Sequence, residues 1–229
     1  MNHYFIENPA LLTQERQLFL DIFGMEFEFL TNNGLFSCNK IDEASKILLE
    51  QMPPITGDLL DLGCGYGVLG IVLSKKNKIN LTMSDVNSLA LDYAVKNAKL
   101  NQVIATAIHS DGFANITESY HHITLNPPIH AGKEVMYRLY EEATKHLHVG
   151  GSLYVVIQKK HGAESTKKKL LELFKDCHTL YKKKGVFVYQ ARNPFFTNAI
   201  QNSTINTKTF AHIITNDCQR GVSPPPVVK

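Results

Sequence analysis

The sequence predicts an α/β fold: a doubly wound, mostly parallel sheet with an antiparallel edge strand, preceded by a small extension made of a β-hairpin and a helix. From residue 58 onward, short apolar segments alternate with longer amphipathic segments. Such alternation is typical of strands joined by right-handed helical crossovers, with helices on both faces of a parallel sheet. Two strand-like segments around Lys184-Gly185 close the pattern and predict an antiparallel pair. We therefore divide the chain into an extension (1–57), an α/β core (58–193) and an unassigned tail (194–229).

The extension begins with two segments of alternating apolar and polar residues. They surround Phe23-Gly24 within residues 16–30 and are followed by a turn at residues 31–34, so they predict a hairpin. Asp42 precedes an amphipathic stretch, residues 43–52, and its side chain suits the N-cap of a helix. Pro53-Pro54 should end this helix, because proline lacks the backbone N–H that the helix needs.

The core is predicted from segments of two lengths. The short apolar segments, which we interpret as strands, are residues 58–63, 80–85, 105–111, 121–126 and 152–158. The longer amphipathic segments, which we interpret as helices, are residues 65–76, 88–101, 134–147 and 164–176. Gly150-Gly151 should break the third helix before the next strand begins, because glycine is a poor helix former.

Composition indicates a globular protein with a single buried core. Of the 229 residues, 44% are hydrophobic, which is ample for such a core. No stretch approaches the roughly 20 apolar residues of a membrane span, and the N-terminus lacks a basic segment followed by an apolar one. We therefore expect a cytoplasmic protein that does not contact a membrane. The four cysteines are far apart and show neither zinc-ligand nor disulfide spacing, so no metal site is predicted.

The net charge of +3 is unevenly distributed along the chain. Lysines cluster within residues 159–184, whereas the preceding residues are acidic on balance. Clustered lysines favour a polyanionic partner, because they release the counterions of phosphate groups. A solvated helix face and a charged sheet edge are the alternative for each cluster taken singly.

Polar residues and glycines occupy the ends of four expected strands. In open α/β sheets, ligands bind outside the carboxyl ends of the strands, so these residues predict one shared site. They are Asp61, Gly63, Gly65 and Gly67 after the first strand, Asp85 after the second, Asp111 and Gly112 after the third, and Asn126, Pro127, Pro128 and Ile129 after the fourth.

The glycine segment is compatible with two kinds of ligand. Residues 65–70 fit the dinucleotide fingerprint G-x-G-x-x-G, which keeps a nicotinamide dehydrogenase open as an interpretation. Asp61, however, precedes the glycines, where a carboxylate would repel a pyrophosphate and attract the sulfonium and amino groups of S-adenosylmethionine. With that cofactor, Asp85 would accept the ribose hydroxyls and Asp111 the adenine amine, and the N–H of Gly112 or Phe113 would lie near the ring.

The strand-end residues together resemble the motifs of class I S-adenosylmethionine-dependent methyltransferases, whose fold is Rossmann-like. The Asn-Pro-Pro motif at 126–128 is similar to that of enzymes that methylate a planar exocyclic nitrogen. More narrowly, residues 33–37, 42–45, 126–133 and 156–163 resemble the RsmC-type 16S rRNA (guanine-N2)-methyltransferases, in their short single-domain bacterial form. The resemblance covers about residues 2–192 and implies methyl transfer to guanine N2 in 16S rRNA or the small ribosomal subunit.

The Asn-Pro-Pro motif suits the chemistry that the resemblance implies. An exocyclic amine is a poor nucleophile, because its lone pair is delocalised into the ring. The side-chain oxygen of Asn126 and the backbone carbonyl of Pro127 can each accept one of its N–H groups and aim the lone pair at the methyl group. We therefore expect Asn126 and Pro127 to be catalytic, with no Asp, Glu or His acting as a base.

The substrate contacts are predicted around this motif. A flipped base is held by aromatic or apolar faces, which Pro128, Ile129 and Phe36 can supply. Many relatives carry an aromatic residue at the position of Ile129. His130 is a further candidate for substrate contact, and Lys159 and Lys160 follow the fifth core strand, where they could contact RNA phosphates.

Several alternatives remain open from the sequence. Adenine N6, guanine in another RNA and a protein glutamine amide are also compatible with Asn-Pro-Pro, and a catalytically silent RNA-binding protein could keep the fold. Ala44 stands where relatives commonly show glycine. The tail from 194 on resembles no known segment; we expect it to be flexible and dispensable for activity. The oligomeric state is not predicted.

Overall fold

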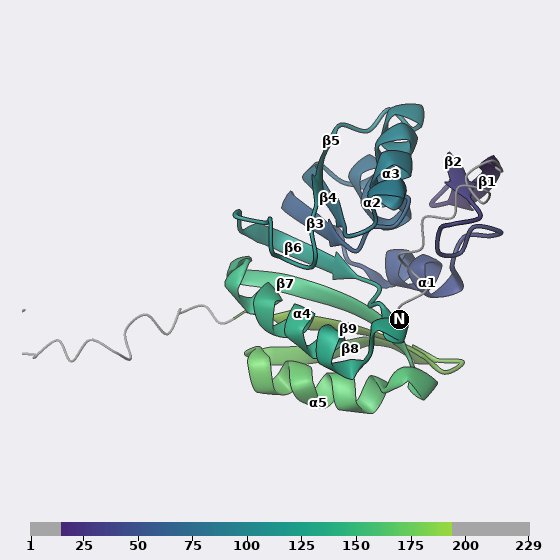
Figure 1. Ribbon diagram of the computed structural model, residues 1–229. Coiled ribbons are helices and arrows are strands. Elements are labelled where there is room, and N and C mark those ends of the chain that lie inside the picture. The colour runs from purple at the N-terminus through teal and green to yellow at the C-terminus, as the bar shows by residue number, and fades with distance from the viewer. Residues whose placement is uncertain (1–14, 194–229) are drawn as a thin grey trace, which may run out of the picture. The chain divides into compact units, whose positions relative to one another are not determined.

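A computed structural model of the chain describes residues 15–193 and confirms the predicted α/β fold (Figure 1). Its strands are β1 (Glu15–Ile22), β2 (Met25–Asn32), β3 (Gly57–Leu62), β4 (Ile79–Asp85), β5 (Ala105–His109), β6 (Tyr120–Leu125), β7 (Leu147–Gln158), β8 (Asp176–Lys183) and β9 (Val186–Arg192). Its helices are α1 (Glu43–Gln51), α2 (Val68–Lys76), α3 (Ser88–Leu100), α4 (Lys133–Lys145) and α5 (Ala163–Leu173), with the short 3-10 helices η3 (Ile129–Ala131) and η4 (Lys159–His161).

The central sheet has seven strands in the order β5-β4-β3-β6-β7-β9-β8. β3 to β7 are parallel, whereas β9 runs antiparallel to both β7 and β8, as the segments around Lys184-Gly185 predict. From β3 the chain moves outward to β4 and β5, then returns to place β6 on the other side of β3. Such a reversal of strand order opens a crevice at the carboxyl ends of the strands. The topology therefore places a binding site where β3 and β6 end.

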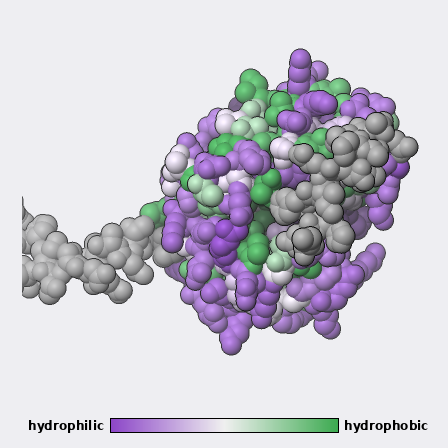
Figure 2. Space-filling model, viewed as in Figure 1, coloured by the Kyte–Doolittle hydropathy of each residue, from purple (hydrophilic) through white to green (hydrophobic). Residues whose placement is uncertain are grey.

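Two hydrophobic cores cover the two faces of this sheet. Helices α1, α2 and α3 pack on one face, and α4 and α5 on the other (Figure 1). Leu59 of β3 belongs to the first core and its neighbour Leu60 to the second, because successive side chains of a strand point to opposite faces. The face shown in Figure 2 is mostly hydrophilic, with a strip of hydrophobic residues near its centre.

The predicted N-terminal hairpin forms, as the separate two-stranded sheet of β1 and β2. Asn97 of α3 and Asn101, the C-cap residue of this helix, bind it to the core. Asn97 accepts the N–H of Leu30 at 2.7 Å, and its Nδ2 donates to the carbonyls of Leu30 and Tyr66, both at 2.8 Å. Asn101 donates to the carbonyl of Glu28 at 2.7 Å. These side-chain amides supply hydrogen bonds to backbone groups of β2 that have no neighbouring strand on this side.

Gly150-Gly151, which were expected to end the third core helix, do not break it. α4 already ends at Lys145, and Gly150-Gly151 lies inside β7, so this prediction is wrong. The pairing of β6 with β7 shifts register at this point, and Gly150 has a φ of 76°. A Cβ on Gly151 would lie 2.9 Å from the carbonyl oxygen of His148 and 3.0 Å from that of His121. The glycines therefore form a bulge that other residues would not fit.

The glycine segment after β3 also differs from the prediction, because α2 begins at Val68 and not at Gly65. Gly63, Gly65 and Gly67 have φ values of 65°, 55° and 94°, which helical backbone does not adopt. The three glycines form a turn that leads into α2, and the third of them is the N-cap of this helix.

Replacing Gly67 with alanine is expected to lower the free energy of unfolding by about 2 kcal/mol. Its Cβ would lie 2.9 Å from Cδ1 of Ile71 and 3.3 Å from Cα and Cβ of Ala94, in addition to the strain of the positive φ. Urea denaturation measures the loss. Gly24→Ala is the matched control, since Gly24 has a φ of 69° but no atom within 4 Å of the added Cβ; an equal loss in both variants would mean that crowding contributes nothing.

Within residues 15–193, none of the helices has the length and apolar composition that a membrane crossing requires. The tail at 194–229 lies outside the described residues, and the boundaries at 57/58 and 193/194 stay predictions.

Candidate active site

A cavity of about 500 Å³ lies at the carboxyl ends of β3, β4 and β6, at the reversal of strand order. Ligand pockets commonly have this size. Most of the residues that the sequence singles out meet here, although they come from separate loops. Those that line the cavity are Phe36, Gly63, Gly65, Asp85, Asp111, Gly112, Asn126, Pro127, Pro128, Ile129 and His130.

Four predicted site residues do not line the cavity. Asp61 is buried, with 1% of its surface exposed. Gly67 packs against α2 and α3. Lys159 and Lys160 are exposed in η4, whose last residue, His161, does line the cavity. The two lysines therefore lie near the rim, and their contact with RNA phosphates stays a prediction.

Asp85 holds the glycine turn and borders the cavity. Its Oδ2 accepts the N–H of Gly65 at 2.8 Å, and its Oδ1 accepts the N–H of Asn87 at 2.8 Å. Burial raises the pKa of Asp85, and these backbone N–H groups oppose the rise. Each carboxylate oxygen can accept further hydrogen bonds, so the side chain is fixed in direction and keeps acceptor capacity for a ligand.

Asp61 serves the packing of α2 against the sheet. Its Oδ2 accepts the N–H of Gly70 in α2 at 2.8 Å, and its Oδ1 accepts the hydroxyl of Thr124 in β6 at 3.0 Å. Burial raises its pKa to about 6, although both hydrogen bonds act in the opposite direction. Because the carboxylate is enclosed by protein, it can act on a bound cation through its charge and not by contact.

Asp111 is paired with an arginine that the sequence analysis did not identify. Oδ1 of Asp111 lies 2.7 Å from Nη2 of Arg138, which comes from α4 and also lines the cavity. Nothing in the amphipathic pattern of α4 distinguishes this arginine from other exposed positions of the helix. The pair shows that Asp111 shares its charge with a cation at the place where the adenine contact is predicted.

The side chain of Asn126 is oriented by the first turn of α1. Its Nδ2 donates to Oδ2 of Asp42 at 3.0 Å and to Oγ of Ser45 at 3.1 Å. Asp42 is the N-cap of α1 and also accepts the N–H of Ser45 at 2.8 Å. A carboxylate can only accept hydrogen bonds, so the amide nitrogen must face it. Both N–H groups of Asn126 are therefore used, and its Oδ1 is the atom it offers to a ligand.

These features agree with a family comparison. A family model described as the methyltransferase small domain matches residues 26–190, which include the glycine turn, Asp85 and Asn126-Pro127. The chain belongs to this methyltransferase family. The match confirms the resemblance to class I methyltransferases, and with it the predicted cofactor, S-adenosylmethionine.

Two relatives show how much of this methyltransferase is similar to known proteins. It is 35% identical over 196 residues to the uncharacterized protein YbxB of Bacillus subtilis, covering 83% of this chain and 98% of that protein. It is 37% identical over 142 residues to the ribosomal RNA small subunit methyltransferase C of Vibrio cholerae, covering 60% of this chain and 42% of that protein. The chain thus spans less than half the length of the Vibrio relative.

Solved structures of similar fold lead to the same group. The methyltransferase superposes with a TM-score of 0.71 and 28% identity on the 16S rRNA N2 G1207 methyltransferase of T. thermophilus, which was solved in complex with AdoMet and guanosine. The superposition covers 78% of this chain and 50% of that one. A methyltransferase from Pyrococcus furiosus, at a TM-score of 0.58 and 21% identity, shares the fold. The predicted RsmC type is confirmed by these comparisons.

Proposed function

We propose that this protein transfers a methyl group from S-adenosylmethionine to the exocyclic N2 of a guanine in 16S rRNA of the small ribosomal subunit. The observation that carries the proposal is the Asn126 amide, which Asp42 and Ser45 hold so that its oxygen is left for a donor in the cavity. The similarity to two rRNA methyltransferases, one of them solved with guanosine, supports guanine as the acceptor.

The orientation of the acceptor amine is assigned to Asn126 and Pro127. Oδ1 of Asn126 and the carbonyl of Pro127 each accept one N–H of the amine, which frees its lone pair from the ring and aims it at the methyl group. Pro127 has no N–H, so it presents no competing donor, and the Pro128 that follows restricts its ψ and therefore the direction of its carbonyl. The reaction needs positioning more than a base, since the amine proton can leave after transfer.

The glycine turn suits the methyl donor, whose sulfonium supplies an electrophilic methyl group when it is bound. A Cβ at Gly63 or Gly65 would meet no atom within 4 Å, so the cavity side of this turn has room for a ligand against the backbone. Asp85 presents fixed carboxylate oxygens beside the turn for the ribose hydroxyls. Asp61 adds negative charge beneath it, which favours a cationic donor over a pyrophosphate.

The guanine ring is assigned to the apolar side of the cavity. Pro128 and Ile129 lie on this side directly after Asn126-Pro127, and Phe36, 51% exposed, lines the cavity from the extension. An exposed aromatic ring is a natural stacking partner for a base that has left its helix. His130 contacts the same space, and the exposed Lys159 and Lys160 are assigned to backbone phosphates.

Replacing Asp42 with serine is expected to lower kcat about tenfold while leaving the melting temperature close to that of the wild type. Serine remains a good N-cap, so α1 keeps its start, but the carboxylate that turns the Asn126 amide is lost. Methyl-transfer kinetics and thermal melting separate the two effects. An unchanged kcat would show that Asp42 does not position Asn126.

Labelled methyl transfer tests the proposed function. Small subunits, free 16S rRNA and total protein from a strain that lacks the enzyme are incubated with labelled S-adenosylmethionine, and the products are analysed as nucleosides. We expect N2-methylguanosine from 16S rRNA and a rate of labelling at least about 100-fold lower with the Asn126→Ala variant. Label in N6-methyladenosine, in another RNA or in glutamine would show that the acceptor is not guanine N2 of 16S rRNA. Absence of transfer to any acceptor would favour a catalytically silent RNA-binding protein.

A further inference from the structure

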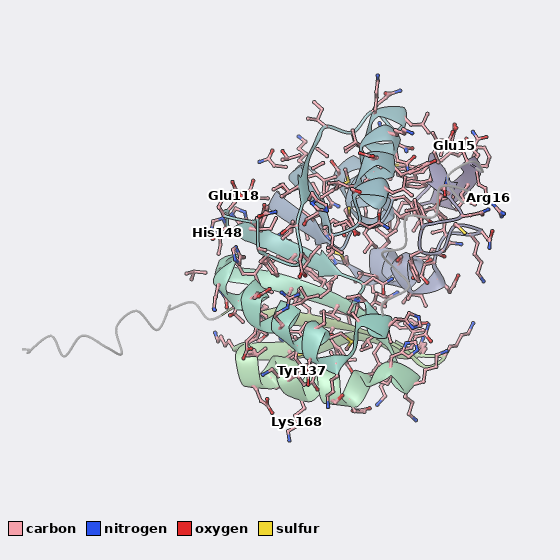
Figure 3. The ribbon with its side chains drawn as sticks, in the orientation of Figure 1. Glu15, Arg16, Glu118, Tyr137, His148 and Lys168 are labelled. Carbon is pink, nitrogen blue, oxygen red and sulfur yellow. The ribbon has the colours of Figure 1, made fainter. Side chains whose placement is uncertain are left out.

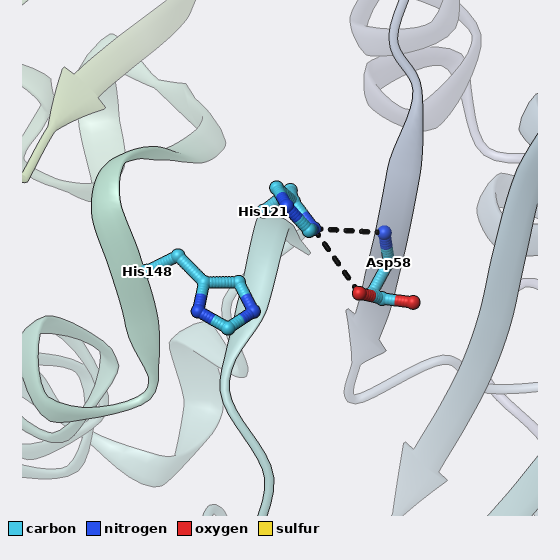
Figure 4. Close-up of side chains that lie close together, drawn as sticks. All are labelled: Asp58, His121 and His148. Carbon is cyan, nitrogen blue, oxygen red and sulfur yellow. Dashed lines mark hydrogen bonds and ion pairs between the residues drawn. The ribbon is translucent and has the colours of Figure 1, made fainter. Parts of the chain in front are cut away.

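Three potential metal ligands meet at the edge of the sheet opposite the cavity (Figure 4). Asp58 lies at the start of β3, His121 near the start of β6 and His148 near the start of β7. Each offers one ligand atom, and these atoms all lie within 4.8 Å of one another. Figure 3 shows His148 at the end of the molecule where β7 begins. The cluster is therefore separate from the methyl-transfer site, which lies where the strands end.

The backbone around the cluster is shaped to admit the two imidazoles. Gly57 has a φ of 87°, and a Cβ there would lie 2.7 Å from Nδ1 of His121, so glycine lets that ring keep this position, whereas a larger residue would displace it. The bulge at Gly150-Gly151 shifts the register of β7, and it allows the ring centroids of His121 and His148 to lie 4.5 Å apart. Bulges commonly re-aim side chains next to functional sites.

The carboxylate of Asp58 is already turned toward the histidines. Its Oδ1 accepts a hydrogen bond from Nδ2 of Asn80 at 2.8 Å, which fixes the plane of the group. Its Oδ2 lies 3.1 Å from Nδ1 of His121. Two ligands of one tetrahedral zinc ion with bonds of about 2.0–2.1 Å are separated by about 3.3 Å. Asn80 is thus the kind of outer partner that orients a metal ligand.

We propose that Asp58, His121 and His148 bind one divalent transition-metal ion of the zinc type. Imidazole nitrogen together with carboxylate oxygen is a donor set that zinc and cobalt accept. Three protein ligands leave a fourth position to water, as the exposure of both histidines permits. The ion joins β3, β6 and β7 at their amino ends. No spacing pattern in the sequence indicates this site, because the three ligands belong to three separate strands.

Metal titration of the full-length protein tests this inference. After removal of metal with a chelator, zinc is titrated by calorimetry and cobalt by its visible absorption. We expect one ion per chain, a tetrahedral cobalt spectrum and a melting temperature that rises with zinc. Asp58→Asn, His121→Ala and His148→Ala are each expected to weaken binding at least about tenfold. Circular dichroism without metal checks that each variant is folded.

His178→Ala is the matched control. His178 of β8 also lies beside a carboxylate, with its Nε2 3.3 Å from Oδ1 of Asp176, but it contacts the Arg192 guanidinium at 3.1 Å in place of a second histidine. Its removal should leave the affinity unchanged, as should the Asn126→Ala variant, which separates this inference from the proposed function. Absence of stoichiometric binding, or equal affinity of the wild type and the His148→Ala variant, would overturn the proposal.

Discussion

Replacing Asn126 with alanine is expected to lower kcat for methyl transfer by about 100- to 1,000-fold, with the affinity for S-adenosylmethionine nearly unchanged. The change removes one of the two oxygens assigned to the acceptor amine, and loss of a single preorganised polar group at a reacting centre commonly has an effect of this size. The cofactor contacts assigned to the glycine turn and Asp85 remain. Single-turnover transfer at saturating substrate measures the chemical step, and calorimetry measures cofactor binding.

Two further variants make this result specific. Asn126→Asp keeps an oxygen but places a second carboxylate about 3 Å from Asp42, so we expect it to be as inactive as Asn126→Ala. Asn80→Ala removes an exposed asparagine at the opposite edge of the sheet and should transfer methyl groups at the wild-type rate. Wild-type turnover by Asn126→Ala would refute the assigned orientation of the amine.

The second large effect is expected in the pH dependence of stability, through Asp61. Burial raises the pKa of this carboxyl from 3.8 to about 6 in the folded chain. Between these values the folded state binds more protons than the unfolded state, so the free energy of unfolding falls as the pH rises. The shift corresponds to about 2 kcal/mol between pH 4 and pH 7. The Asp61→Asn variant, which has no proton to lose, should lack this loss.

Urea denaturation of the wild type and of Asp61→Asn at several pH values, without cofactor, measures the effect. The difference between the two free energies of unfolding cancels the titrating groups that do not interact with Asp61. The stability of the wild type relative to Asp61→Asn should be greater at pH 4 than at pH 7. Asp92→Asn removes an exposed carboxylate of α3 and controls for the change in net charge. A difference that is constant with pH would show that folding does not raise the pKa of Asp61.

The sheet and most of its helices follow from local patterns in the sequence. Apolar segments of strand length, Asp42 as an N-cap and Phe23-Gly24 as a hairpin turn depend on neighbouring residues only. The meeting of Asp85, Asp111 and Asn126 at one cavity follows as well, because parallel strands end at the same edge. Polar residues after strands were therefore enough to locate the site.

What the sequence did not predict depends on residues that approach only in the folded chain. Asn126 binds Asp42 and Ser45 across separations of 84 and 81 residues, so Asp42 indicated a helix cap and nothing about the amide. Arg138 reaches Asp111 from a helix whose pattern has no special signal. A glycine pair is compatible with a helix break and with a bulge in a strand. Only the pairing of β6 with β7 shows that Gly150-Gly151 forms a bulge.

Asn97 connects the N-terminal extension to the core by hydrogen bonds. One amide nitrogen donates to the backbone of β2 and to Tyr66 in the glycine turn. We therefore expect displacement of the hairpin to strain the turn to which the methyl donor is assigned, and a ligand that immobilises this turn to tighten the attachment of the hairpin. We therefore expect the two strands outside the central sheet to be coupled to the proposed donor pocket, so that RNA held against them would alter the affinity for the donor without touching it.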